Sequence, residues 1–195
     1  MTAAIEIGDT LSWIAQALAV PVLIGALLLL AALTLEVGRF GIELWRRRRP
    51  QRGSLQALTQ QVRANPATAP ALAEQAPSTL SADAVRGLAA AGTDNARIEH
   101  ALADYELAVQ RRLDKTRLLV RAGPALGLMG TLFPLAPGLE ALADGNVTSL
   151  AQDLKTAFGA TVVGLLVGTV AFALTLWRTR MYTEDLVSLE RGAGQ

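Results

Sequence analysis

Three long stretches without an ionisable side chain constrain the fold of this chain more than any other feature. They cover residues 10–35, 122–139 and 156–177, which are 26, 18 and 22 residues long. As helices with a rise of about 1.5 Å per residue, they would span roughly 39, 27 and 33 Å. The hydrocarbon core of a bilayer is about 30 Å thick. The sequence therefore predicts an all-α membrane protein with three transmembrane helices.

The charges between these stretches predict how the chain is oriented. Residues 46–121 carry 13 Lys+Arg and 7 Asp+Glu, whereas residues 1–9 and 140–155 each have a net charge of −2. Basic segments stay on the cytoplasmic side, so we expect a multi-pass protein of the cell (inner) membrane. Its expected segments are an external N-terminus (1–9), a first transmembrane helix (10–45), a cytoplasmic helical region (46–121), a second transmembrane helix (122–139), an external loop (140–155), a third transmembrane helix (156–177) and a cytoplasmic tail (178–195).

The first apolar stretch is predicted to be a retained helix rather than a secretory signal peptide. It lacks a basic segment before it, it is too long for a signal sequence, and the arginine run 46–49 follows it. Such a run directly after an apolar helix is typical of a stop-transfer signal. A nucleic-acid or localisation patch is the less favoured alternative.

Composition argues against enzymatic and metal chemistry. The chain has no cysteine and a single histidine, His100, and its net charge is +1, so we expect no metal site, no cofactor and no nucleic-acid partner. The close acidic pairs, Asp104 with Glu106 and Glu184 with Asp185, are expected to be solvated charges. We predict that the protein is not an enzyme.

The cytoplasmic region is predicted to be helical but broken. Prolines interrupt residues 51–92, where we expect helices over 54–64 and, with Ser81 as N-cap, over 82–91, in a loosely folded region. With Thr93 as N-cap, a longer helix is expected to run unbroken into the second apolar stretch. Its apolar stripe recurs every three or four residues: Ile98, Leu102, Tyr105, Val109, Leu113, Thr116 and Val120. The Asp144-Gly145-Asn146 sequence indicates a turn.

Glycines mark the helix faces that can approach another helix closely. They are Gly123, Gly127 and Gly130 on the second apolar stretch, and Gly164 and Gly168, a GxxxG pair, on the third. We expect these faces to pack helices, and close packing of this kind favours an oligomer. The third stretch also carries an apolar face that we expect to contact lipid, formed by Val163, Leu166, Val167, Val170, Leu174 and Trp177.

Two threonines, Thr131 and Thr161, are candidates for lining an ion path. A threonine in a membrane helix can also return its hydroxyl to a carbonyl of its own helix, and the residues alone leave both interpretations open. None of the three stretches contains a titratable group, which an ion path through a membrane requires. Such a group would have to come from a partner.

Two motifs resemble a known family. Residues 112–131, ending in Gly127-Leu128-Met129-Gly130-Thr131, and residues 160–165, Ala-Thr-Val-Val-Gly-Leu, are similar to the MotA/TolQ/ExbB proton channel family. The resemblance extends over residues 108–190 and includes the three-span topology of the ExbB and TolQ branch.

This resemblance implies a pentamer that encloses the single membrane helices of an ExbD-, TolR- or MotB-like partner with an essential aspartate. It also implies that Thr131 and Thr161 face that aspartate in a motor driven by an ion, expected to be the proton. Besides its partners, the subunit contacts membrane lipid. A non-conducting membrane scaffold is the alternative function. The ion and the driven process remain open.

Overall fold

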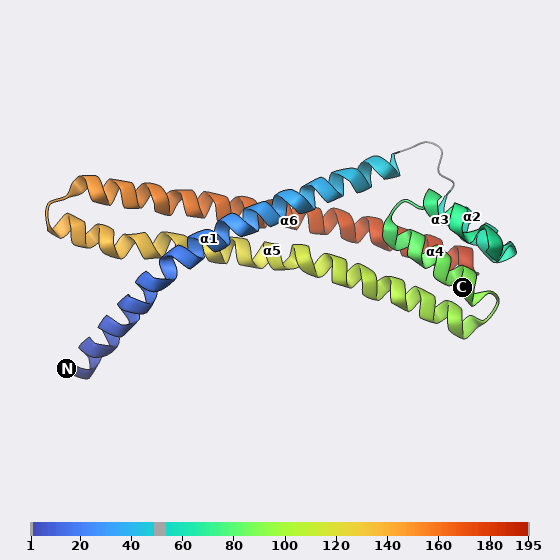
Figure 1. The fold of residues 1–195 in the computed structure, drawn as a ribbon, viewed down its shortest axis with the longest axis horizontal. Helices are drawn as coiled ribbons and strands as arrows, with labels where there is room; N and C mark the ends of the chain where they lie inside the picture. Colours follow the sequence, from blue (N-terminus) through green and yellow to red (C-terminus); the bar gives the residue numbers. More distant parts are fainter. Residues whose placement is uncertain (1, 49–53, 195) are drawn as a thin grey trace. The chain divides into compact units, whose positions relative to one another are not determined.

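The computed structural model describes residues 2–48 and 54–194, so that Arg49 of the predicted stop-transfer run lies outside the described residues. Within these ranges the chain forms helices and no strand, which confirms the predicted all-α class (Figure 1). The elements are α1 (Thr2–Arg47), α2 (Leu55–Ala64), the short 3₁₀ helix η1 (Pro66–Thr68), α3 (Ala69–Gln75), α4 (Thr79–Ala91), α5 (Asn95–Ala143) and α6 (Val147–Ala193).

Helices α1, α5 and α6 are long and apolar enough to cross a membrane. Each contains one of the three uncharged stretches and continues well beyond it. Residues 2–9, expected as a separate external segment, are the first turns of α1. The protein therefore has three candidate membrane-spanning helices, in agreement with the prediction from the sequence.

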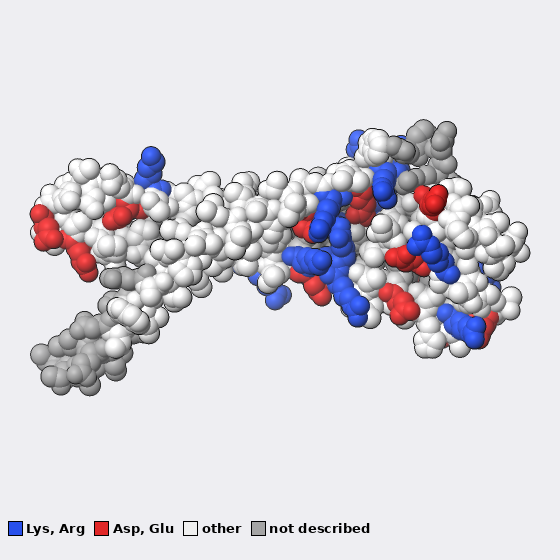
Figure 2. All heavy atoms as spheres, in the orientation of Figure 1, with Lys and Arg blue, Asp and Glu red and all other residues white. Residues whose placement is uncertain are grey.

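The chain divides into two compact units. One comprises Met1–Leu35 and Arg117–Ala173, and we call it the apolar unit because it contains the first two uncharged stretches and most of the third. The other, the polar unit, comprises Glu36–Thr116 and Leu174–Gln195. In Figure 2 the described side chains of the uncharged stretches are white, and the blue and red side chains belong to the segments that flank these stretches in the sequence. Each long helix thus contributes one segment to each unit.

A tight turn joins α5 to α6 in the apolar unit. Gly145 has φ +78°, which favours glycine, and the Asn146 side chain accepts a hydrogen bond from the Ser149 N–H at 3.1 Å. The predicted turn at Asp144-Gly145-Asn146 is confirmed. The expected external loop over 140–155, however, is helical apart from residues 144–146. The prediction was wrong because a polar charge pattern does not distinguish a loop from the last turns of a long helix.

Helix α5 begins one residue later than expected. Asp94, not Thr93, caps it, since the Asp94 carboxylate accepts a hydrogen bond from the Ala96 N–H at 3.0 Å. As predicted, the helix then runs unbroken into its apolar stretch, past Pro124. The apolar stripe is buried most completely at Ile98, Tyr105, Leu113 and Thr116.

The polar unit has a hydrophobic core of its own. Val62 of α2 and Val85 and Leu88 of α4 are fully buried, and they pack with the first turns of α5 and the last turns of α6. The expectation of a loosely folded region was wrong. Pro66 and Pro70 lie in the first turn of η1 and of α3, where proline is tolerated, so they separate short amphipathic helices that still pack. Ser78 rather than Ser81 caps α4.

Candidate functional site

Glycines bring the backbones of α5 and α6 together in the apolar unit. A Cβ added to Gly164 would lie 2.5 Å from the Gly123 carbonyl oxygen and 2.6 Å from the Gly127 Cα. Added to Gly123, it would lie 2.9 Å from the Gly168 nitrogen. Real Cβ atoms do not tolerate such distances, so glycine is required on both helices. The GxxxG pair of α6 thus packs against α5 of the same chain.

Two further contacts extend this packing along the helices. A Cβ on Gly168 would lie 2.7 Å from the Pro124 ring, so Gly168 makes room for a proline in the middle of α5. A Cβ on Gly130 would lie 2.6 Å from the Ala160 Cβ and 3.8 Å from Leu23 of α1. The glycines therefore lie where α5 meets its neighbours within one subunit.

This packing corrects the lipid face expected on α6. Val167 and Leu174 are 1% and 4% exposed, buried within the chain, whereas Leu165 and Phe172 are more than half exposed. The prediction was wrong for Val167 and Leu174, because valine and leucine suit lipid and helix contacts equally. Leu166 and Trp177, in contrast, are 50% and 59% exposed, as expected. The small residues Gly164, Gly168 and Ala171 decide which face of α6 packs inward.

The two candidate threonines lie at a similar level on adjacent helices. A Cβ on Gly127 would lie 3.5 Å from the Thr161 Cα, and Gly130, which contacts Ala160, precedes Thr131. The two hydroxyls differ in their hydrogen bonding. The Thr131 hydroxyl donates a hydrogen bond to the Leu128 carbonyl at 2.7 Å. The Thr161 hydroxyl is buried without a hydrogen-bond partner among the described residues.

An unmatched hydroxyl in a dry environment costs free energy, about 1–3 kcal/mol when nothing replaces its bond to water. Thr161 is on α6, a helix in which other threonines do bond their own helix: the Thr156 hydroxyl donates to the Gln152 carbonyl at 3.2 Å. The Thr161 hydroxyl is thus a buried polar group of the apolar unit that is available for a further partner.

The polar unit holds a buried ion pair at the start of its α1 and α6 segments. Arg178 donates to the Glu36 carboxylate at 2.7 Å, and its side chain is fully buried. Its guanidinium lies 5.8 Å from the centre of the Phe40 ring, which stacks on Trp177. Both charged residues directly follow the uncharged stretches that end at residues 35 and 177.

Further buried polar contacts follow along the same two helices. The Tyr182 hydroxyl donates to Glu43 at 3.2 Å. Arg47 donates to both Asp185 oxygens, at 2.9 and 2.5 Å, and Asp185 also accepts a hydrogen bond from the Ser81 hydroxyl of α4 at 3.0 Å. Asp185 was therefore wrongly expected to be solvated. The other three acids of the close pairs, Asp104, Glu106 and Glu184, are exposed.

The sequence analysis did not predict this series of buried polar pairs, although the spacing of the charged residues along α1 and α6 indicates it. Glu36 and Glu43 are seven residues apart on α1, and so are Arg178 and Asp185 on α6. Residues at this spacing share one face of a helix, and on these two faces Glu36 pairs with Arg178 and, further along, Arg47 pairs with Asp185. The missing information was which helices are neighbours.

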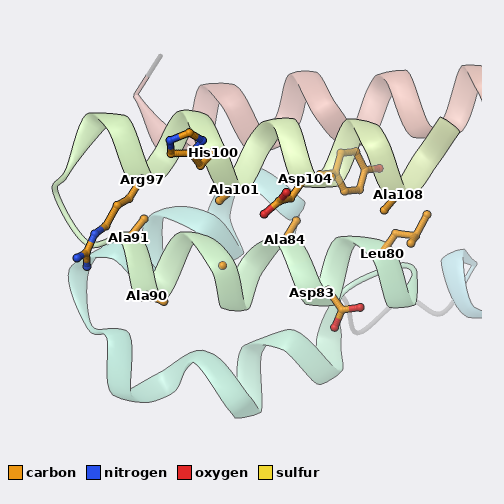
Figure 3. Close-up of a pocket in the computed structure, with 12 residues that line it drawn as sticks. Leu80, Asp83, Ala84, Ala90, Ala91, Arg97, His100, Ala101, Asp104 and Ala108 are labelled. Atoms are coloured by element: carbon orange, nitrogen blue, oxygen red, sulfur yellow. The ribbon is translucent and has the colours of Figure 1, made fainter. Parts of the chain in front are cut away.

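A groove of about 480 Å³ lies between α4 and the beginning of α5 in the polar unit (Figure 3). Alanines such as Ala84 and Ala101 line its base, and Asp83, Arg97 and His100 are charged or polar groups at its rim. The residues that the structure describes include no group of three or more His, Asp or Glu side chains that could hold a metal ion.

Together, the three long apolar helices and the close glycine packing define a multi-pass α-helical membrane protein. The comparison with protein families supplies the assignment: residues 67–190 match the model of the MotA/TolQ/ExbB proton channel family. The chain belongs to this family, as its motifs suggested. Neither the comparison with curated proteins nor that with solved structures gave a match.

The matched residues include α3 to α5 and nearly all of α6, and therefore both candidate threonines. They exclude α1 and α2. Glu36, Glu43 and Arg47 thus lie outside the matched range, whereas their partners on α6 lie inside it.

Proposed function

We propose that this protein is the pore-forming subunit of a motor complex in the cytoplasmic membrane, which uses proton flow to drive mechanical work in a partner. Its ring is a homo-oligomer, a pentamer as the family resemblance implies. The partner contributes a single membrane helix with an aspartate near the bilayer centre. The subunit itself is not an enzyme, and its N-terminus is external.

The observation that carries this proposal is the unmatched hydroxyl of Thr161, which lies in a stretch of 22 residues without an ionisable side chain. The apolar unit has no titratable group within its uncharged stretches, so an ion path needs one from outside the chain. A hydroxyl can donate to a carboxylate and accept from a protonated carboxyl. It therefore suits both states of a partner aspartate.

The free-energy cost of placing a carboxylate in the bilayer and the free energy that the membrane potential supplies are comparable. Placing a carboxylate at the bilayer centre costs about 2.5–3.5 kcal/mol, and a charge that crosses the membrane potential gains about 2.3 kcal/mol per 100 mV. Membrane potential can thus shift the aspartate between its charged and its protonated form. Each change alters its hydrogen bonds to Thr131 and Thr161 and moves the partner helix against the ring. Rotation about χ1 would carry the Thr161 hydroxyl out of its buried position toward the partner.

The test begins with the protein that the adjacent gene encodes, which should contain one membrane helix with a central aspartate. The two proteins are co-purified, imaged as a particle and reconstituted into liposomes with a pH-sensitive dye inside. An imposed potential should drive proton uptake. Thr131→Val and Thr161→Val should leave the particle intact and reduce this flux at least tenfold.

Thr34→Val is the matched control. Like the Thr131 hydroxyl, its hydroxyl donates to a carbonyl of its own helix, here that of Leu30 in α1 at 2.8 Å. Thr34 lies outside the two motifs that the proposed ion path uses, so flux should remain as in the unchanged protein. Flux that persists in both threonine variants would refute the pore role. An intact complex that conducts no protons under any potential would instead favour the membrane scaffold.

A further inference from the structure

A basic cavity of about 470 Å³ lies in the polar unit, and the proposed function does not use it. Four cations line it: Arg39 and Arg46 from α1, and Arg112 and Lys115 from α5. The one carboxylate in its lining is that of Glu43, so the formal charges leave an excess of three positive charges. Two helices that are distant in sequence thus direct cations into one space.

Three of these cations form no ion pair within the part of the chain that the structure describes. Arg112 interacts electrostatically with Glu36, but that carboxylate is already paired with Arg39 and Arg178. Arg39 forms an ion pair with Glu36 at 3.1 Å, whereas Arg46, Arg112 and Lys115 form none with any carboxylate of the described residues. The Glu43 carboxylate is already engaged, since Tyr182 donates to it and Arg47 lies 3.8 Å away. Cations that converge without a counter-charge attract an anion.

The cavity also offers neutral hydrogen-bond donors. The N-terminus of α4, with Ser78 as its cap and Thr79 and Leu80 in its first turn, forms part of the wall and supplies backbone N–H groups. Helix N-termini carry a partial positive charge, which adds to that of the four side chains. A phosphate group, with several acceptor oxygens and a negative charge, matches such a lining.

The position of the cavity along the helices indicates where the anion comes from. Arg39 and Arg46 follow the end of the uncharged stretch of α1, residue 35, by 4 and 11 residues. Along the helix this places their Cα atoms about 6 and 16 Å beyond the end of that stretch. Lys115 precedes the uncharged stretch of α5 by 7 residues, or about 10 Å. Headgroups occupy the layer about 5–8 Å thick next to the core, and long basic side chains reach into it.

We propose that this cavity binds the phosphate-containing headgroup of an anionic phospholipid. Basic cavities beside membrane helices are suited to such headgroups. The positive-inside rule explains an excess of cations somewhere in this region, but it does not require four of them to face one cavity. A bound lipid would connect α1, α4 and α5 within the polar unit through one headgroup.

The test uses the full-length protein, delipidated in detergent and titrated with phosphatidylglycerol or phosphatidylcholine, with bound lipid counted by native mass spectrometry. The unchanged protein should bind phosphatidylglycerol at least tenfold more tightly. An Arg112→Gln/Lys115→Gln variant should bind it about 25-fold more weakly, at roughly fivefold per cation. The single Arg46→Gln variant, whose side chain is exposed, should bind it about fivefold more weakly.

Arg111→Gln/Arg180→Gln is the matched control, because it removes the same charge from exposed positions of the polar unit outside the cavity lining. Binding should change less than threefold. Equal weakening in this control would show a diffuse surface attraction and overturn the site. Displacement of the lipid by inorganic phosphate at millimolar concentration would also overturn the proposal of a lipid headgroup and indicate that the cavity binds a soluble anion.

Discussion

Helix α6 uses one face for two different kinds of packing. In the apolar unit its buried residues are mostly small, with Gly164, Gly168 and Ala171 in succession beside the one larger side chain of Val167. In the polar unit the same face continues with large or charged side chains, namely Leu174, Arg178, Tyr182, Asp185 and Leu189. The three- and four-residue spacing persists along the whole helix while the chemistry changes.

The difference reflects what each environment offers. Lipid tails are as apolar as leucine, so helices in a bilayer gain from close backbone contact rather than from burial, and glycine permits that contact. Outside the hydrocarbon core, burial of apolar surface stabilises a core such as that around Val62 and Leu88. Charged pairs there can specify which helices meet. The apolar unit thus depends on small residues, and the polar unit on a core with matched charges.

The largest expected effect comes from breaking the buried ion pair of the polar unit. Glu36→Ala leaves the fully buried Arg178 without its carboxylate, which should destabilise the protein by about 3–5 kcal/mol. The measurement is unfolding in detergent, followed by circular dichroism. Glu184→Ala, which removes an exposed carboxylate paired with Arg180, should cost less than about 1 kcal/mol.

The double variant Glu36→Leu/Arg178→Leu sharpens this prediction. Replacing both members of a buried ion pair with apolar side chains is often neutral, so the double variant should recover most of the lost stability. If the double variant is no more stable than Glu36→Ala, the two charges do not stabilise each other. The polar unit would then not depend on matched charges, and its contrast with the apolar unit would be wrong.

The next effect concerns the glycine contacts of the apolar unit. Gly164→Ala forces a Cβ to within 2.6 Å of backbone atoms on α5, and overpacking of this kind costs about 1–3 kcal/mol. Gly159→Ala lies on the same helix with open space around its Cβ and should be neutral or slightly stabilising. The melting temperature in detergent checks both. Equal stability of the two variants would show that α5 and α6 do not meet at this point.

Much of the fold could be predicted from the sequence because its signals are local. Uncharged length defines the membrane helices, Ser54 marks the start of α2, and Gly145 marks the turn before α6. The helix starts that were predicted wrongly are those at which two nearby residues could each act as the N-cap. Thr93 and Asp94 are adjacent and both suit an N-cap, and only the hydrogen bonds to Ala96 and Arg97 identify Asp94.

The site could be predicted only in part, because it depends on which helices are neighbours. The motifs were sufficient to select Thr131 and Thr161, but they did not indicate that one hydroxyl is satisfied and the other is not. The pairing of Glu36 with Arg178 joins residues 142 positions apart, and no local pattern encodes it. The basic cavity likewise combines side chains of α1 and α5. In the sequence these side chains indicate only positive charge, not that they line one cavity.

A smaller effect tests the local cap of the polar unit. Asp94→Ala removes the side-chain acceptor for the Ala96 N–H and should cost about 1 kcal/mol. Asp104→Ala, at an exposed position of the same helix, should leave stability nearly unchanged. Hydrogen exchange of the amides of residues 95–98 should accelerate only in the first variant. Equal acceleration in both variants would mean that the cap does not hold the start of α5.

The smallest effect has the opposite sign and links stability to function. Thr161→Val keeps the side-chain shape but removes a buried hydroxyl that has no partner, so we expect a gain of about 0.5–1 kcal/mol. Thr131→Val removes a hydroxyl that is bonded to Leu128 and should bring no gain. Unfolding of the isolated subunit in detergent compares the two. A loss of stability in Thr161→Val would show that the hydroxyl already has a partner within the subunit. A gain accompanied by loss of proton flux would mean that the protein retains this hydroxyl at the expense of its own stability, as expected of a group whose partner is a second protein.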